Sequence, residues 1–179
     1  MKEYTDYDGL GLAELVRSKQ VSAGELLDAA VTRAEAAQET LNCFTALYPD
    51  LAKSQLDSGI GSGPFAGVPF VTKDLAVEVK GAPLTNGSVA WKGNVAQRDS
   101  VLTERYRQAG LVFFGQTTSP EYGLTTTTES TLYGQTRNPW DLTRTSGGSC
   151  SLYQQTTSSR GARQLAPGRL PGRSCPLTR

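Results

Sequence analysis

Apolar residues recur every three or four positions up to about residue 41, and they form short continuous runs after residue 67. The first pattern predicts amphipathic helices, and the second predicts strands buried in a sheet. The first helix spans about Gly9 to Arg17, with Leu12, Leu15 and Val16 on one face and Asp8 placed to cap its first turn.

A longer helix begins at a capping-box pattern, Ser22-Ala23-Gly24-Glu25, in which the serine and the glutamate each satisfy a backbone amide. Another short helix is predicted over residues 51–56. Residues 58–64 form a glycine-rich connector, because a dinucleotide-binding loop would follow a strand and this segment precedes one. Residues 1–57 are therefore interpreted as a helical arm. The apolar face of its long helix consists of Leu26, Leu27, Ala30, Val31, Ala34 and Leu41.

The two apolar runs that predict strands lie in Gly67–Leu75 and in Leu111–Phe114. Between them, Asp99 or Ser100 can cap a helix that ends before Gly110. A strand, a helix and a second strand joined by short connections indicate an α/β sheet. We expect this α/β part to occupy residues 64–149.

The hydroxyl-rich segment from Thr117 to Ser130 allows two interpretations. It could form an exposed polar loop or one wall of a polar pocket. Because connecting segments usually run over the surface, the sequence favours the exposed loop.

The composition is that of an ordinary globular protein, with 37% hydrophobic residues, 20% charged residues and a net charge of +1. We therefore expect no nucleic-acid partner. No apolar run approaches the length that spans a bilayer, and the first residues resemble no secretory signal, so a cytoplasmic protein without membrane contact is predicted. Three scattered cysteines indicate neither a disulfide framework nor a zinc site. No cofactor or metal is expected.

The chain contains no histidine. This excludes from it the Ser-His-Asp triad, the Cys-His dyad and the usual histidine zinc site. Hydrolytic chemistry would need another base, and a lysine made neutral by burial can supply one. Lys73 at the end of the first strand and the serine of Gly147-Gly148-Ser149 form a candidate Ser-Lys pair. Taken singly, each motif is also typical of a snorkelling lysine or an ordinary loop.

Together with the segments between them, these two motifs resemble the amidase signature family of serine hydrolases. The resemblance covers about residues 9–149, and its most specific part is the stretch that contains Lys73. Its ordered points are Pro64, residues 67–75, Pro83, Thr85, Gly87-Ser88, Asp99-Ser100, Ala109-Gly110, Thr117, Pro120-Glu121, Gly123, residues 128–130, Tyr133-Gly134 and residues 136–141.

The resemblance implies a mixed-sheet fold and cleavage of carbon-nitrogen amide bonds by a Ser-cisSer-Lys triad. Lys73 corresponds to the catalytic lysine, and Ser149 to the bridging serine that an unusual cis peptide bond holds. In such a relay the neutral lysine takes the proton of the bridging serine, which takes that of a nucleophilic serine further along the chain. The partner implied is a small-molecule amide.

The family pattern breaks after Ser149. Residues 150–179 contain five arginines, no lysine and no acid, and their prolines and glycines prevent a long helix. We predict a disordered, non-family tail. A basic interaction tail, a lineage-specific ending and out-of-frame translation could each explain it, and the position inside a catalytic motif favours the last. Ser174 lies near the expected nucleophile position, but its surroundings lack the family's glycine run, and it is not assigned.

Residues 1–149 are thus interpreted as a partial amidase domain, comprising the N-terminal part of the fold. The function predicted is that of an amide hydrolase in an incomplete and inactive form. The alternative is a non-catalytic pseudoenzyme or binding module that uses the basic tail. We also expect residues 68–71 and 111–114 to expose strand edges and apolar faces. The sequence specifies neither the amide substrate nor the oligomeric state.

Overall fold

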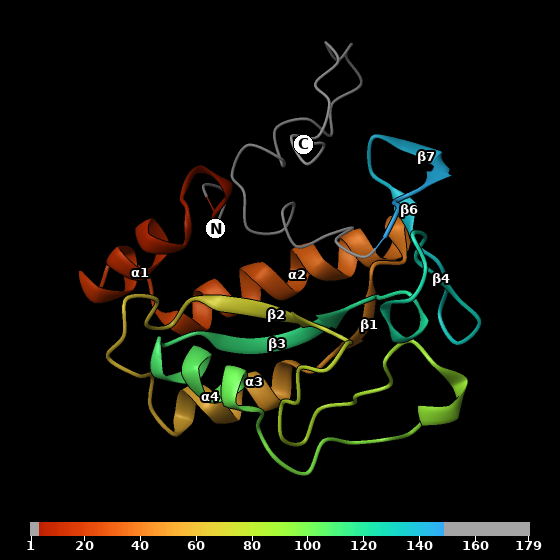
Figure 1. Ribbon diagram of the computed structural model, residues 1–179. Helices are drawn as coiled ribbons and strands as arrows, with labels where there is room; N and C mark the ends of the chain where they lie inside the picture. The colour runs from red at the N-terminus through yellow and green to blue at the C-terminus, as the bar shows by residue number, and fades with distance from the viewer. Residues whose placement is uncertain (1–3, 149–179) are drawn as a thin grey trace, which may run out of the picture.

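The computed structural model describes residues 4–148, so the predictions for Ser149 and for the tail from residue 150 lie outside the described residues. The described part combines α-helices, short 3₁₀ turns and strands (Figure 1). The α-helices are α1 (Gly9–Arg17), α2 (Ala23–Leu41), α3 (Pro49–Asp57) and α4 (Val101–Gln108). The 3₁₀ turns are η1 (Tyr4–Asp6), η2 (Val89–Trp91) and η3 (Glu121–Gly123). The strands are β1 (Phe44–Leu47), β2 (Pro69–Lys73), β3 (Val112–Thr117), β4 (Glu129–Ser130), β5 (Gly134–Gln135), β6 (Arg137–Asn138) and β7 (Asp141–Thr145).

The central sheet is mixed and has the strand order β1-β3-β2. β2 and β3 run parallel and are joined through α4, whereas β1 pairs antiparallel with β3. Parallel neighbours need a crossover connection, and α4 lies within it. β4 and β5, and likewise β6 and β7, form two small antiparallel ribbons apart from this sheet. The α/β class predicted from the sequence is confirmed.

The helix caps follow the local sequence. The Asp8 side chain accepts a hydrogen bond from the Gly11 N–H at 2.8 Å. At the start of α2, the Ser22 hydroxyl oxygen accepts from the Glu25 N–H at 3.2 Å, and Glu25 accepts from the Ser22 N–H at 2.9 Å. The predicted capping box is therefore present. At the start of α4, Ser100 is the residue that caps the helix.

The sequence pattern does not predict β1. Its four residues follow α2 closely, and only Phe44 is buried. So short a segment, buried at one position, carries no clear strand periodicity. It forms a strand because β3 offers an edge, with Phe44 opposite Thr117 and Leu47 opposite Gly115. The N-terminal segment of residues 1–57 therefore contributes a strand as well as helices.

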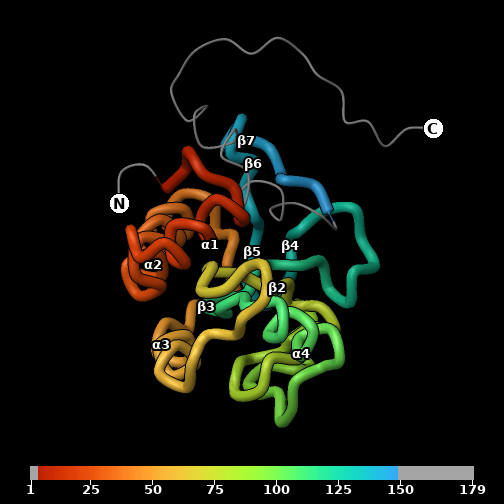
Figure 2. The backbone as a smooth tube through the Cα atoms, turned by 90° about the vertical axis from the view of Figure 1, so that its left-hand side faces the viewer, coloured from red at the N-terminus to blue at the C-terminus, as the bar shows by residue number. Residues whose placement is uncertain are grey.

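Two apolar clusters hold the fold together. One joins α2 to the three central strands, and the other joins α1 and α4 to the first residues of β2 and β3. α2 and α4 lie on opposite sides of the β2–β3 pair in both views (Figures 1 and 2). The expectation of exposed apolar faces is wrong, because Val68, Val71, Phe113 and Phe114 are all buried. α1, α2 and α4 cover these faces.

No helix within residues 4–148 combines the length and the apolar character needed to cross a bilayer. α2 is the longest helix there, and its sequence alternates apolar residues with charged ones. It accordingly packs one face on the sheet and leaves the other in solvent.

Candidate active site

Lys73 is the last residue of β2, as the sequence predicted for a lysine at the end of a buried strand. The four residues before it are buried, and Lys73 itself is half-buried. In the parallel ladder Lys73 lies opposite Thr117, the last residue of β3. The carboxyl ends of β2 and β3 thus lie side by side at one end of the central sheet, and Lys73 lies at that end.

The turn that leads to Ser149 is built from two glycines with different constraints. Gly147 has φ +77°, a left-handed conformation that L side chains rarely adopt, and its carbonyl accepts a hydrogen bond from the Thr128 hydroxyl at 2.8 Å. A Cβ on Gly148 would lie 3.0 Å from the Cγ of Pro120 and 3.0 Å from the carbonyl carbon of Thr126. Glycine is therefore required twice, first for its conformation and then for close approach.

The segment after β3 brings the two sequence motifs to the same end of the sheet. Thr117 pairs with Lys73, and three residues later Pro120 packs against Gly148. The Gly147-Gly148 turn is thus held against residues 120–128, which continue from the strand beside the lysine. Ser149 follows Gly148 directly in the sequence, but its own position lies outside the described residues.

The hydroxyl-rich segment is only partly an exposed loop. Thr125 and Thr126 are exposed, as the favoured interpretation predicts. Five other hydroxyl side chains are buried, and four of them bond to distant segments; for example, Thr118 bonds to Thr136 at 2.8 Å, and Ser119 donates to the Asp74 carbonyl at 2.8 Å. The exposed-loop interpretation is therefore wrong for Thr117, Thr118, Ser119, Thr128 and Ser130.

A buried carboxylate follows the candidate base directly. Asp74 is 1% exposed, and it receives hydrogen bonds from the loop around Thr85. The Thr85 hydroxyl in turn lies 3.1 Å from the Tyr133 hydroxyl, on the connection between β4 and β5. Asp74 is not among the site residues predicted from the sequence, although an acid directly after the lysine of a buried strand indicates a polar group at the same end of that strand.

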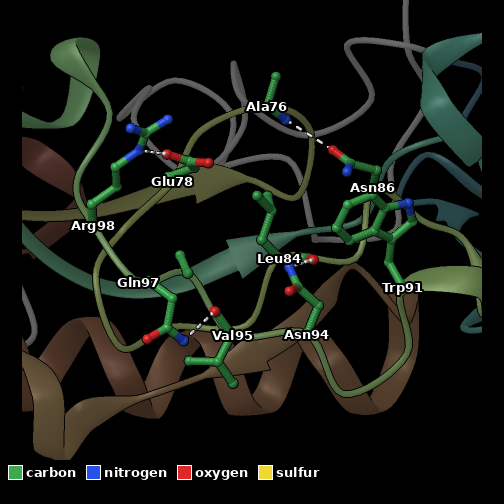
Figure 3. A pocket seen from close by; sticks show the side chains of 10 residues that line it. Ala76, Glu78, Leu84, Asn86, Trp91, Asn94, Val95, Gln97 and Arg98 are labelled. Atoms are coloured by element: carbon green, nitrogen blue, oxygen red, sulfur yellow. Dashed lines mark hydrogen bonds and ion pairs between the residues drawn. The ribbon is translucent and has the colours of Figure 1, made fainter.

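The long connection between β2 and α4 carries a half-open pocket of about 460 Å³ (Figure 3). Its polar groups bond among themselves: Arg98 to Glu78 at 3.3 Å, and the Asn94 side chain to the Leu84 carbonyl at 2.8 Å. Glu78 and Arg98 lie across the pocket from Trp91 (Figure 3). Lys73 does not line this pocket. The pocket adjoins the candidate site through Asn86, whose N–H donates a hydrogen bond to the Asp74 carboxylate.

Cys43 offers no alternative nucleophile. It is fully buried, and burial raises the pKa of its thiol to about 12, so the reactive thiolate is scarce at neutral pH. Across residues 4–148, no group of three or more histidine, cysteine, aspartate or glutamate side chains gathers in a way that could hold a metal ion.

Asp99 anchors the end of the connection between β2 and α4, directly before the residue that caps α4. Burial by itself would raise the pKa of this carboxyl, but hydrogen bonds from the Arg107 guanidinium at 2.6 Å and from the Lys80 N–H at 2.7 Å outweigh it. The pKa of Asp99 consequently falls below its usual value of 3.8. The ion pair with Arg107 is partly exposed, so its contribution to stability is about 1 kcal/mol or less.

We expect Asp99→Asn to destabilise the protein near neutral pH and to have little effect in strong acid. Because the native pKa is depressed, the contribution of the carboxylate is complete above its unfolded-state pKa and is lost as the pH falls through the lower native value. Urea unfolding of both proteins at neutral pH and well below pH 3.8 measures this. An equal difference at both pH values would contradict it.

Comparison with known proteins places this arrangement in a family. The family model described as Amidase matches residues 25–151. The 6-aminohexanoate-cyclic-dimer hydrolase of Paenarthrobacter ureafaciens is 41% identical over 144 residues, covering 79% of this chain and 29% of that protein. One subunit of the glutamyl-tRNA(Gln) amidotransferase of Acidothermus cellulolyticus is 34% identical over 145 residues, covering 77% of this chain and 28% of that one.

Solved structures agree with the sequence comparisons. The structure of 6-aminohexanoate cyclic dimer hydrolase complexed with substrate matches with a TM-score of 0.77 and 37% identity, over 90% of this chain and 33% of that one. A bacterial aryl acylamidase of the amidase signature family matches with a TM-score of 0.73 and 30% identity, over 81% and 32%.

The fold is therefore the N-terminal part of the mixed α/β fold of the amidase signature enzymes. The chain belongs to the amidase signature family, whose members include amide hydrolases. It spans about a third of the length of the relatives that it matches. The family match ends at residue 151, although the sequence continues to Arg179.

Proposed function

We propose that residues 1–149 carry two members of a Ser-cisSer-Lys triad that hydrolyses carbon-nitrogen amide bonds, with Lys73 as the base and Ser149 as the bridging serine. The observation that carries this proposal is the shared end of the sheet: Lys73 ends β2 opposite Thr117, and the Gly147-Gly148 turn packs on Pro120 just beyond β3. The family match over residues 25–151 supports the same assignment.

In the proposed reaction, the neutral amine of Lys73 accepts the proton of the Ser149 hydroxyl. Ser149 in turn accepts the proton of a nucleophilic serine, whose oxygen attacks the amide carbon. The tetrahedral intermediate expels the amine, which takes up the proton returned through Ser149, and water then hydrolyses the acyl-enzyme. A lysine suits this role because its amine can lose its charge, whereas the guanidinium of an arginine keeps it.

We further propose that the chain with this sequence does not complete the reaction. The nucleophile of the triad has no assigned residue here, and the family match stops at residue 151. Residues 150–179 are interpreted as a non-family tail. The proposal also includes a small-molecule amide as the substrate class, a cytoplasmic location, and no nucleic-acid or membrane partner. No observation within residues 4–148 favours the alternative of a binding module that uses the basic tail.

The full chain should release no ammonia from acetamide or benzamide beyond the rate of its Lys73→Ala variant. A base without its nucleophile can relay no proton to an attacking oxygen, so the variant loses nothing measurable. A coupled assay for ammonia at high protein concentration makes the comparison. Turnover by the full chain that Lys73→Ala abolishes would contradict the proposed inactivity, while leaving Lys73 as a catalytic residue.

A further inference from the structure

We propose that Asp74 is a positioning residue: its buried carboxylate fixes the loop of residues 85–87 to the end of β2 and thereby holds Lys73 in place. The inference rests on the role proposed for Lys73 as the base. Asp74 itself would touch neither the substrate nor the transferred proton. Its contribution would be to keep the end of β2 ordered directly after Lys73, so that the Lys73 amine keeps its orientation.

The carboxylate is held by one short loop. Its Oδ1 accepts hydrogen bonds from the Thr85 N–H at 2.7 Å and the Asn86 N–H at 3.2 Å, and its Oδ2 accepts from the Gly87 N–H at 3.3 Å. The Thr85 hydroxyl also donates to Oδ2. These four donors satisfy the charge, and none of the ion pairs found within residues 4–148 involves Asp74. A buried carboxylate with such partners is costly to disturb.

The loop has a backbone shaped for an anion. Asn86 and Gly87 are successive residues with φ +52° and +68°, and this left-handed pair turns consecutive N–H groups toward one point. Gly87 allows no side chain, because a Cβ there would lie 2.8 Å from the Ser119 carbonyl oxygen. The loop is thus an anion-binding concavity, and the chain fills it with its own carboxylate.

The backbone of Asp74 is fixed as firmly as its side chain. Its N–H donates to the Thr117 carbonyl at 3.0 Å, and its carbonyl accepts from the Ser119 hydroxyl at 2.8 Å. The chain then leaves the strand at once, since Ala76 has φ +57°. Lys73 is therefore clamped between the β2–β3 ladder on one side and the Asp74 anchor on the other. This arrangement favours a positioning role over a merely stabilising one.

The test is nuclear magnetic resonance of the full chain labelled with ¹³C at the lysine Cε, with Lys73→Arg used to assign the Lys73 signal. Asp74→Asn keeps Oδ1 but presents an NH₂ group to the Gly87 N–H, so two donors face each other. We expect the Lys73 signal to move toward the position of the exposed lysines, and amide exchange at Gly87 to accelerate at least tenfold.

Asp99→Asn is the matched control, because Asp99 also anchors the same connection through a backbone N–H, that of Lys80. It should leave the Lys73 signal in place. Thr85→Val, which removes a single hydroxyl, should produce a smaller shift in the direction of Asp74→Asn and covers the case in which that variant does not fold. Two outcomes would overturn the proposal. One is a shift of the Lys73 signal that is equal in Asp74→Asn and Asp99→Asn, and the other is a Lys73 signal that stays in place in both Asp74→Asn and Thr85→Val. These readouts need no substrate, so a failure of the amidase assignment remains distinguishable.

Discussion

Lys73→Ala should lower amide hydrolysis by about 10²- to 10⁴-fold in a chimera that supplies the nucleophile, since a general base contributes about that much. The chimera joins residues 1–149 of this chain to the remainder of the 6-aminohexanoate-cyclic-dimer hydrolase of Paenarthrobacter ureafaciens. That relative is 41% identical over the aligned 144 residues, so the carboxyl ends of β2 and β3 should be compatible with it. Release of product from the cyclic dimer measures the activity.

Two further variants separate a base from a mere positive charge. Lys73→Arg should be about as inactive as Lys73→Ala, because a guanidinium keeps its charge in proteins and cannot accept a proton. Lys53→Ala, which removes an exposed lysine from α3, should retain the activity of the chimera. Ser149→Ala should lose activity in the chimera as Lys73→Ala does. Substantial activity in Lys73→Ala, comparable with that of Lys53→Ala, would refute the role of Lys73.

Gly110→Ala should destabilise the protein by about 2–5 kcal/mol, because the added methyl group meets both a strained backbone conformation and close backbone atoms. Gly110 has φ +92°, and a left-handed conformation costs a residue with a Cβ about 1–2 kcal/mol. The added Cβ would also lie 2.6 Å from the Cα of Ala66 and 2.7 Å from its nitrogen, and crowding of this kind costs about 1–3 kcal/mol. Backbone atoms cannot swing aside as a flexible side chain can.

Gly93→Ala isolates the conformational part of this effect. Gly93 also has a positive φ, +81°, but a Cβ there would meet no atom within 4 Å. It should therefore cost only about 1–2 kcal/mol. Urea unfolding followed by circular dichroism measures both variants. If the two substitutions cost the same, the close packing of Gly110 against Ala66 would not be what makes it necessary.

The packing around Gly110 also matters for the site. Its carbonyl accepts from the Gly67 N–H at 3.0 Å, and the neighbouring Ala109 carbonyl accepts from the Phe65 N–H at 2.8 Å. These two bonds hold the connector before β2 to the turn before β3. They bring the amino ends of the two parallel strands together, and a register shift between Phe70 and Val71 then places Lys73 opposite Thr117.

Several features could be predicted from the sequence because they depend on neighbours within one turn or one strand. The capping box joins Ser22 to Glu25, which lie three positions apart. The apolar run that ends on Lys73 predicted a buried strand with a lysine at its end, and the structure confirms it. The motif pattern also led to the family that the comparisons show. In the capping box and the strand, the residues that determine the structure lie close together in the sequence, so a local pattern reveals them.

Only the tertiary structure decided the features that join distant segments. β1 forms a strand because it pairs with the edge of β3. Asp99 does not cap α4, because its carboxylate accepts hydrogen bonds from Arg107 and from the Lys80 N–H instead. The Asp74 carboxylate accepts its hydrogen bonds from residues more than ten positions away in the sequence, in the loop that begins with Thr85. Local periodicity carries no information on such pairs, since their free energy depends on which segments the whole chain brings together.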